Sequence, residues 1–166
     1  MTDLRLERVF ESLSAGRGRI LVSRLQYLGD VVLSLPLVAA LRKQFPRCEI
    51  DYLTRPAGVE LLAGDPIVDE LFCAPASGSG PAATLRLMRR LRRREYRLAF
   101  DLYSNPRSAV LVRASGATVR IGGTRRIRRH LFTHAVTVPG TIRSAIQHHL
   151  YFLKCLGLAA EAVKIR

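Results

Sequence analysis

Gly29 and Asp30 place a carboxylate directly after a glycine, between an apolar run over 19–25 and an amphipathic run over 30–44. A strand followed by a helix is the simplest interpretation of that pattern. A glycine at such a turn permits a positive φ angle or a close approach of another backbone. Aspartate is a favoured N-cap residue, and its charge interacts well with the helix dipole. The local pattern alone therefore favours a helix cap at Asp30.

Other polar side chains stand near the ends of predicted strands, where they could bind anions. Arg24 ends the first strand, Arg55 follows the second, Asn105 and Arg107 follow the fourth, and Arg120 begins the fifth, with Gly122 and Gly123 at its end. A cluster of guanidinium groups suits phosphate or carboxylate recognition, because each group can form two parallel hydrogen bonds. The alternative for each arginine is a solvated or ion-paired position on the surface, and the pattern leaves both open.

Strands and helices that would position these residues alternate along the chain. We expect strands over 19–25, 48–53, 68–74, 96–103, 119–123 and 134–139. We expect helices over 30–44, 56–63, 82–94 and 141–158, and a turn with a short helix over 105–116. Pro36 should kink the first of these helices or mark a second start. The alternation predicts an α/β fold, a Rossmann-like doubly wound parallel sheet, whose ligands bind beyond the carboxyl ends of the strands.

The composition limits the classes of protein and partner. Hydrophobic residues make up 48% of the 166 residues, which is enough for one domain with a core. The net charge of +14 implies an anionic partner: nucleic acid, a lipid surface or a phosphorylated small molecule. No apolar run approaches the ~20 residues that a membrane span needs. The sequence has no dinucleotide fingerprint after the first strand and no P-loop, which argues against a nucleotide-cofactor enzyme or an NTPase.

Cysteines and histidines give no sign of a metal site. Cys48, Cys73 and Cys155 lie far apart without zinc spacing, so we expect buried thiols in a reducing cytosol. His148 and His149 have no cysteine or acid at ligand spacing, so we expect them in the core or on the surface.

Three stretches carry a more specific pattern. The first is ILVSRLQYLGDVVLSLPLVAALRKQFPRCEIDYLTRPAGVELLAGDPIVDELF, with a basic residue, LGD, an apolar stretch containing proline, a helix ending in FP, and DYLTRP. The others are YRLAFDLYSNPRSAVLVRASGATVRIGG and YFLKCLGL. Over about residues 19–158 this pattern resembles glycosyltransferase family nine, the ADP-heptose:lipopolysaccharide heptosyltransferases.

The resemblance implies a metal-independent transferase of the GT-B type, whose N-terminal Rossmann-like domain binds the acceptor. Asp30, in the GD motif, is then the candidate general base, a role that is compatible with a helix cap. The candidate acceptor-binding residues are Arg24, Gly29, Arg55, Asn105, Arg107 and Arg120. Asp30 would deprotonate an acceptor hydroxyl group, whose oxygen attacks the anomeric carbon as a nucleotide diphosphate leaves, with inversion. No cofactor is implied beyond the co-substrate, a nucleotide-sugar expected to be ADP-heptose.

The resemblance also implies an organisation and partners. We expect residues 1–18 to be a polar lead, 19–158 the acceptor-side domain, and 159–166 the start of a linker to a missing donor-binding domain. A chain of this kind should have little activity alone. The expected partners are an acceptor like the lipopolysaccharide inner core, a second Rossmann-like domain or subunit, and an anionic membrane surface. The expected location is the cytoplasm, at the inner face of the cytoplasmic membrane, and no specific nucleic acid is expected.

Two other functions remain open on the sequence. The first is a basic module that binds nucleic acid or an anionic surface, suggested by the net charge and by an arginine-rich helix face over 86–94. That face could equally be solvated. The second is a noncatalytic remnant that pairs with another subunit, which an exposed apolar patch would support.

Overall fold

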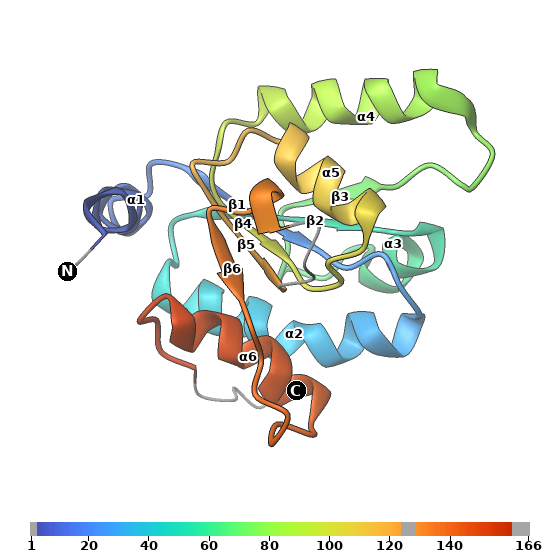
Figure 1. Ribbon diagram of the computed structural model, residues 1–166. Coiled ribbons are helices and arrows are strands. Elements are labelled where there is room, and N and C mark those ends of the chain that lie inside the picture. The colour runs from blue at the N-terminus through green and yellow to red at the C-terminus, as the bar shows by residue number, and fades with distance from the viewer. Residues whose placement is uncertain (1–2, 124–128, 161–166) are drawn as a thin grey trace.

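A computed structural model describes residues 3–123 and 129–160 of the chain. Six strands form one parallel sheet in the order β3-β2-β1-β4-β5-β6 (Figure 1). The strands are β1 (Arg19–Ser23), β2 (Glu49–Thr54), β3 (Glu70–Cys73), β4 (Tyr96–Asp101), β5 (Val119–Gly123) and β6 (His134–Val136). The predicted Rossmann-like parallel sheet is therefore confirmed. The strand order reverses between β1 and β4, which is the switch point where ligands of such sheets bind.

Helices cover both faces of the sheet, with α4 and α5 on one face and α2 and α6 on the other (Figure 1). The helices are α1 (Leu4–Ser14), α2 (Leu28–Gln44), α3 (Pro56–Leu62), α4 (Gly80–Arg93), α5 (Pro106–Ala114), α6 (Ala145–Cys155) and the 3-10 helix η1 (Arg129–Leu131). Alternate residues of each strand serve the two layers: Ile20 and Val22 pack in the core beneath α2 and α6, while Leu21 packs beneath α4 and α5. This explains why the strands read as continuous apolar runs.

Helix α2 begins two residues earlier than expected. Tyr27 is its N-cap residue and makes no side-chain capping bond, so Asp30 lies within the first turn and the predicted cap at Asp30 is wrong. A carboxylate in the first turn still interacts favourably with the helix dipole. The helix continues from Leu28 to Gln44 through the buried Pro36, so Pro36 does not mark a second start.

Helix α6 is shorter than predicted at both ends. It begins after Ser144, whose hydroxyl oxygen accepts a hydrogen bond from the Gln147 N–H, and Gly157 follows its end with φ +73°. The predicted linker over 159–166 lies mostly outside the described residues. The prediction of buried cysteines holds for Cys48 alone, because Cys73 and Cys155 are exposed.

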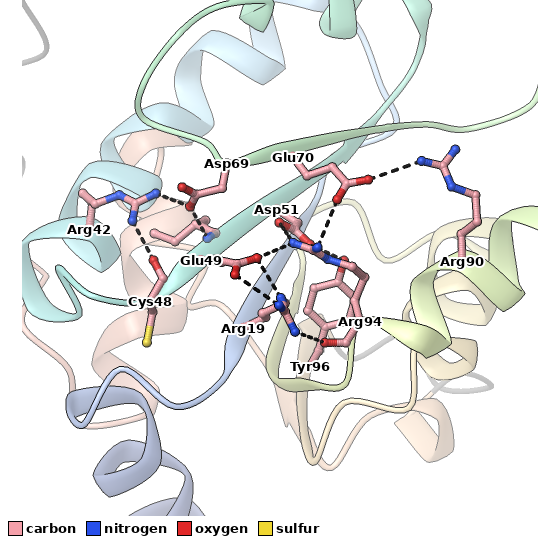
Figure 2. Close-up of polar contacts among 11 residues, drawn as sticks. Arg19, Arg42, Cys48, Glu49, Asp51, Asp69, Glu70, Arg90, Arg94 and Tyr96 are labelled. Carbon is pink, nitrogen blue, oxygen red and sulfur yellow. Dashed lines mark hydrogen bonds and ion pairs between the residues drawn. The ribbon is translucent and has the colours of Figure 1, made fainter.

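Ion pairs join the amino ends of the first strands to α4 (Figure 2). Asp51 is completely buried and accepts hydrogen bonds from Arg94 Nε at 2.8 Å and from the Tyr96 hydroxyl at 2.7 Å. Arg94 also pairs with Glu49 at 2.6 Å and with Glu70 at 3.2 Å. Part of the arginine-rich face of α4 is therefore structural. Burial raises the pKa of Asp51, and the bonds from Arg94 and Tyr96 oppose that shift.

Candidate functional site

Arg24 and Asp30 meet at the carboxyl end of β1, beside the switch point of the sheet. Arg24 Nη2 lies 3.3 Å from Asp30 Oδ2. The Arg24 side chain is 12% exposed and the Asp30 side chain 26% exposed, so the carboxylate remains accessible. Asp30 thus lies in the first turn of α2, beside the Arg24 guanidinium group, where a carboxylate interacts favourably with the helix dipole.

The loop that follows β4 fixes the position of Arg24. Arg24 Nη1 donates a hydrogen bond to the Leu102 carbonyl oxygen, and its guanidinium group lies over the Tyr103 ring at 5.5 Å from the ring centroid. A planar guanidinium group suits both contacts. Arg24 therefore connects the ends of β1 and β4, the two strands that flank the switch point.

A buried aspartate shapes that loop. Asp101 accepts hydrogen bonds from the Tyr103 and Ser104 N–H groups at 3.1 and 2.8 Å and from the Ser108 hydroxyl at 2.9 Å. Burial raises the pKa of Asp101 to about 6, although these donors oppose the shift. Ser104 has a positive φ of 55°, and its hydroxyl oxygen accepts from the Gly123 N–H at 2.7 Å, which ties the loop to β5.

A cavity of about 270 Å³ opens beside this loop. Its lining residues are Leu102, Tyr103, Ser104, Gly123, Val136, Thr137, Val138, His148 and Phe152. The lining thus combines the ends of β4, β5 and β6 with one face of α6. A hollow lined by hydroxyl, imidazole and aromatic groups at the carboxyl edge can bind a polar ring such as a sugar.

Two histidines of α6 lie close to the Arg24–Asp30 pair. His148 lines the cavity, and burial together with the charge of Arg24 lowers its pKa. His149 is buried, and its Nδ1 donates to the Leu33 carbonyl oxygen at 3.1 Å. Burial lowers the pKa of His149 to about 4, so both imidazoles are neutral at pH 7. His149 is therefore a core histidine, as predicted.

Known proteins were compared with the chain by sequence and by structure. No protein-family model matches the chain. Lipopolysaccharide heptosyltransferase 3 of Escherichia coli K12 is 27% identical over 143 residues, which are 81% of this chain and 41% of that protein. A second relative, a lipopolysaccharide heptosyltransferase 3 of Escherichia coli, is 28% identical over 143 residues, which are 81% of this chain and 42% of that protein. The chain thus spans about two fifths of the length of these curated relatives.

Solved structures share the fold. A glycosyl transferase family 9 structure from Veillonella parvula DSM 2008 superposes with a TM-score of 0.75 and 24% identity, over 87% of this chain and 43% of that one. The E. coli heptosyltransferase WaaC, solved with ADP-2-deoxy-2-fluoro heptose, gives a TM-score of 0.72 and 17% identity, over 88% of this chain and 50% of that one. The resemblance to glycosyltransferase family nine is confirmed.

The structure brings together only some of the residues that the family-nine pattern proposed for the site. Arg24 and Asp30 are in contact. Gly29 is exposed, has no positive φ, and has open space where a side chain would lie, so the expected close approach is absent. Arg55 precedes α3 at the same edge of the sheet, and its side chain is exposed without a partner among the described residues.

The remaining three proposed residues have structural contacts. Asn105 caps α5, with its Oδ1 accepting from the Ser108 N–H at 2.7 Å. Arg107 donates to the Pro75 carbonyl oxygen. Arg120 is the second residue of β5, in register with Ala99, and its guanidinium group donates to the Leu131 and Ala117 carbonyl oxygens. It therefore lies away from the carboxyl edge, and its role in binding an acceptor stays a prediction.

Sequence reasoning missed Tyr103, Ser104 and His148, which line the cavity. The run YSN directly after an apolar strand was a local signal for the first two. Nothing local distinguished His148, because the packing of α6 against α2 brings it to the site. Within residues 3–123 and 129–160, no cluster of histidine, cysteine or acidic side chains is arranged to hold a metal ion. None of the described helices is long and apolar enough to cross a membrane.

Proposed function

We propose that this chain forms the acceptor-binding part of a glycosyltransferase of the heptosyltransferase type, with Asp30 as general base. The observation that carries the proposal is the accessible Asp30 carboxylate, which Arg24 holds at the switch point. Arg24 also contacts Leu102 and Tyr103, which line the cavity of about 270 Å³. Support comes from the similarity to lipopolysaccharide heptosyltransferase 3 over 143 residues. The proposed acceptor is a sugar of the lipopolysaccharide core.

In the proposed reaction, Asp30 takes the proton of an acceptor hydroxyl group as the C–O bond forms. The acceptor oxygen attacks the anomeric carbon of the donor sugar. The bond between that carbon and the nucleotide diphosphate breaks, and the diphosphate leaves with the electron pair. Attack from the face opposite the leaving group inverts the configuration at the anomeric carbon. A positioned base of this kind contributes about 10²–10⁴-fold in rate.

Arg24 acts through Asp30 in this proposal. Its guanidinium group is committed to the Asp30 carboxylate, the Leu102 carbonyl oxygen and the Tyr103 ring. These contacts hold the guanidinium group in place, and it in turn orients the Asp30 carboxylate. The exposed Arg55, at the end of the neighbouring strand β2, is better suited to bind a phosphate or carboxylate of the acceptor.

A second Rossmann-like domain or subunit would supply the nucleotide-sugar, proposed to be ADP-heptose. Exposed apolar side chains at the start of α2 support such a partner. Tyr27 is 78% exposed, and Leu28 and Val32 are each 46% exposed, on either side of Asp30. Apolar side chains gathered around a polar site are typical of a surface that another domain covers. The anionic diphosphate would be stabilised from that second domain.

The decisive experiment replaces Asp30 by asparagine in the two-domain enzyme that the proposal requires. We expect transfer from ADP-heptose to a deacylated lipopolysaccharide core to fall at least 100-fold, with unchanged acceptor affinity. Glu60→Gln is the matched control, because Glu60 is an exposed acid of α3 without a partner among the described residues. Unchanged turnover in Asp30→Asn would refute the assignment of the base.

Acceptor binding can be measured on this chain directly. We expect the deacylated core oligosaccharide to shift the backbone amide NMR signals of Tyr103, Ser104 and Gly123, which line the cavity. Signals of Ser115 and Thr118, near the opposite end of the sheet, should not move. Shifts confined to that opposite end would contradict the proposed acceptor site.

A further inference from the structure

Four arginines line a groove at the amino ends of the strands, at the opposite end of the sheet from Asp30. The arginine groove, as we name it, consists of two adjoining cavities of about 410 and 350 Å³. Arg5 and Arg8 of α1 line the first, Arg92 of α4 lines the second, and Arg97 and Thr118 line both. Residues far apart in the sequence thus bring their charges to two cavities that share Arg97 and Thr118.

These arginines differ from others nearby because their charges are not neutralised. None of Arg5, Arg8, Arg92 and Arg97 forms an ion pair or a side-chain hydrogen bond among the described residues, and all four are exposed. By contrast, Arg90 and Arg94 of the same region pair with Glu70. Among the described residues that line the two cavities, Glu95 is the single carboxylate. Of the acids of α1, neither Glu7 nor Glu11 is among the lining residues of the first cavity.

The backbone of the groove is shaped to leave room for these side chains. Gly116 has φ +72°, and a Cβ atom built there would lie 2.1 Å from Arg92 Nη1, so the guanidinium group occupies the space above this glycine. A Cβ atom on Gly18 would lie 2.6 Å from Arg97 Cγ. Two glycines therefore permit the close packing of two arginine side chains against the walls of the groove.

We propose that the arginine groove binds phosphate groups, with the headgroups of anionic phospholipids as their source. Guanidinium groups recognise phosphate oxygens through paired hydrogen bonds, and the two cavities on either side of Arg97 can hold two phosphates. Leu4 is 70% exposed beside Arg5, as in helices that lie at a membrane surface. Single-stranded nucleic acid is less suited. Within the part of the chain that the structure describes, Tyr96 is the only aromatic residue of the lining, and at 2% exposure it cannot stack with a base.

The test compares Arg8→Gln/Arg97→Gln with Arg86→Gln/Arg93→Gln. The second pair removes the same charge from exposed positions of α4 that do not line the groove. Binding of the full chain is measured by co-sedimentation with vesicles of phosphatidylcholine and phosphatidylglycerol at 3:1, and with vesicles of phosphatidylcholine alone. We expect binding to the anionic vesicles only. The groove variant should bind about 30-fold more weakly and the control less than threefold more weakly.

Further measurements distinguish phosphate groups of phospholipids from phosphate in solution and from nucleic acid. Pyrophosphate that shifts the amide signals of Gly116 and Thr118, with no binding to vesicles, would support a phosphate site filled from solution. Equal weakening in both variants would overturn the proposal in favour of nonspecific charge, and so would the absence of binding to both vesicles and pyrophosphate. Groove-dependent binding of a single-stranded DNA oligonucleotide more tightly than vesicles would overturn it in favour of nucleic acid. β4 separates the groove from the Asp30 edge by roughly 17 Å, so these results are independent of those for Asp30.

Discussion

Single buried side chains determine the local geometry of the proposed site, and Asp101 is the clearest example. It lies just before the loop that contacts Arg24, and its two carboxylate oxygens receive three hydrogen bonds. The same burial that makes these bonds strong also penalises the charged carboxylate. Asp101 therefore makes the stability of the site depend on pH.

Asp101→Asn should reveal this dependence. Because the pKa of Asp101 is about 6 in the folded chain and 3.8 when unfolded, its protonated form stabilises the fold below about pH 4, and this contribution is lost as the pH rises through 6. Asparagine can keep the three contacts without a charge. Between pH 4 and pH 7, the free energy of unfolding of the variant should gain roughly 3 kcal/mol relative to the natural chain. Urea unfolding at both pH values measures this, and a difference that does not change with pH would contradict it.

His149 should give the opposite dependence. Its pKa is about 4 in the folded chain and 6.5 when unfolded, so its contribution to stability is present above pH 6.5 and is lost as the pH falls towards 4. In the His149→Gln variant, the glutamine can still donate to the Leu33 carbonyl oxygen but takes up no proton. The part of the acid destabilisation that comes from His149 should therefore disappear. The expected difference between pH 7 and pH 4 is roughly 3 kcal/mol. The same denaturation series tests it, and equal acid sensitivity of both proteins would count against the buried neutral imidazole.

At the scale of elements, Arg94 joins α4 to the sheet. It contacts Asp51, Glu49 and Glu70, which belong to the neighbouring strands β2 and β3 (Figure 2). Among these partners, Asp51 has no exposure to solvent. Removing one member of such a pair leaves a buried charge without compensation, which costs far more than an exposed pair contributes.

Arg94→Met should therefore destabilise the chain by about 3 kcal/mol. Arg93→Met is the control, because Arg93 is the exposed neighbour and forms no ion pair among the described residues, and its change should cost less than about 0.5 kcal/mol. Thermal unfolding followed by circular dichroism compares the two. Equal melting temperatures would show that the pair contributes little to the fold.

The sequence predicted elements well where a pattern is local. The apolar runs predicted β1, β2 and β5, and the turn at Asn105 predicted the start of α5, because each of these patterns depends on neighbouring residues alone. The start of α2 was not predictable, because Tyr27 is a weak cap and the helix is held by burial of its middle. The pairing of Arg94 with Asp51 spans 43 residues and depends on the packing of α4 over β2, so no local signal could show it.

At the scale of the whole molecule, the net charge predicted an anionic partner, but it did not predict where on the surface that partner would bind. Folding neutralises some arginines and leaves others in contact with solvent, as Arg94 and Arg92 show two residues apart. The candidate site was predicted in part for the same reason. Arg24 and Asp30 are close in the sequence, whereas the cavity beside them needs β4, β5 and α6 to come together.

Asp101 and His149 together have a consequence for calorimetry. At about pH 5, unfolding exposes a carboxyl group that releases its proton and an imidazole that takes one up, according to the pKa values of about 6 and about 4 in the folded chain. These two groups therefore exchange no net proton with the solvent when the chain unfolds. Their contribution to the unfolding enthalpy should be the same in buffers of different ionisation heat, whereas either single substitution would make that enthalpy depend on the choice of buffer.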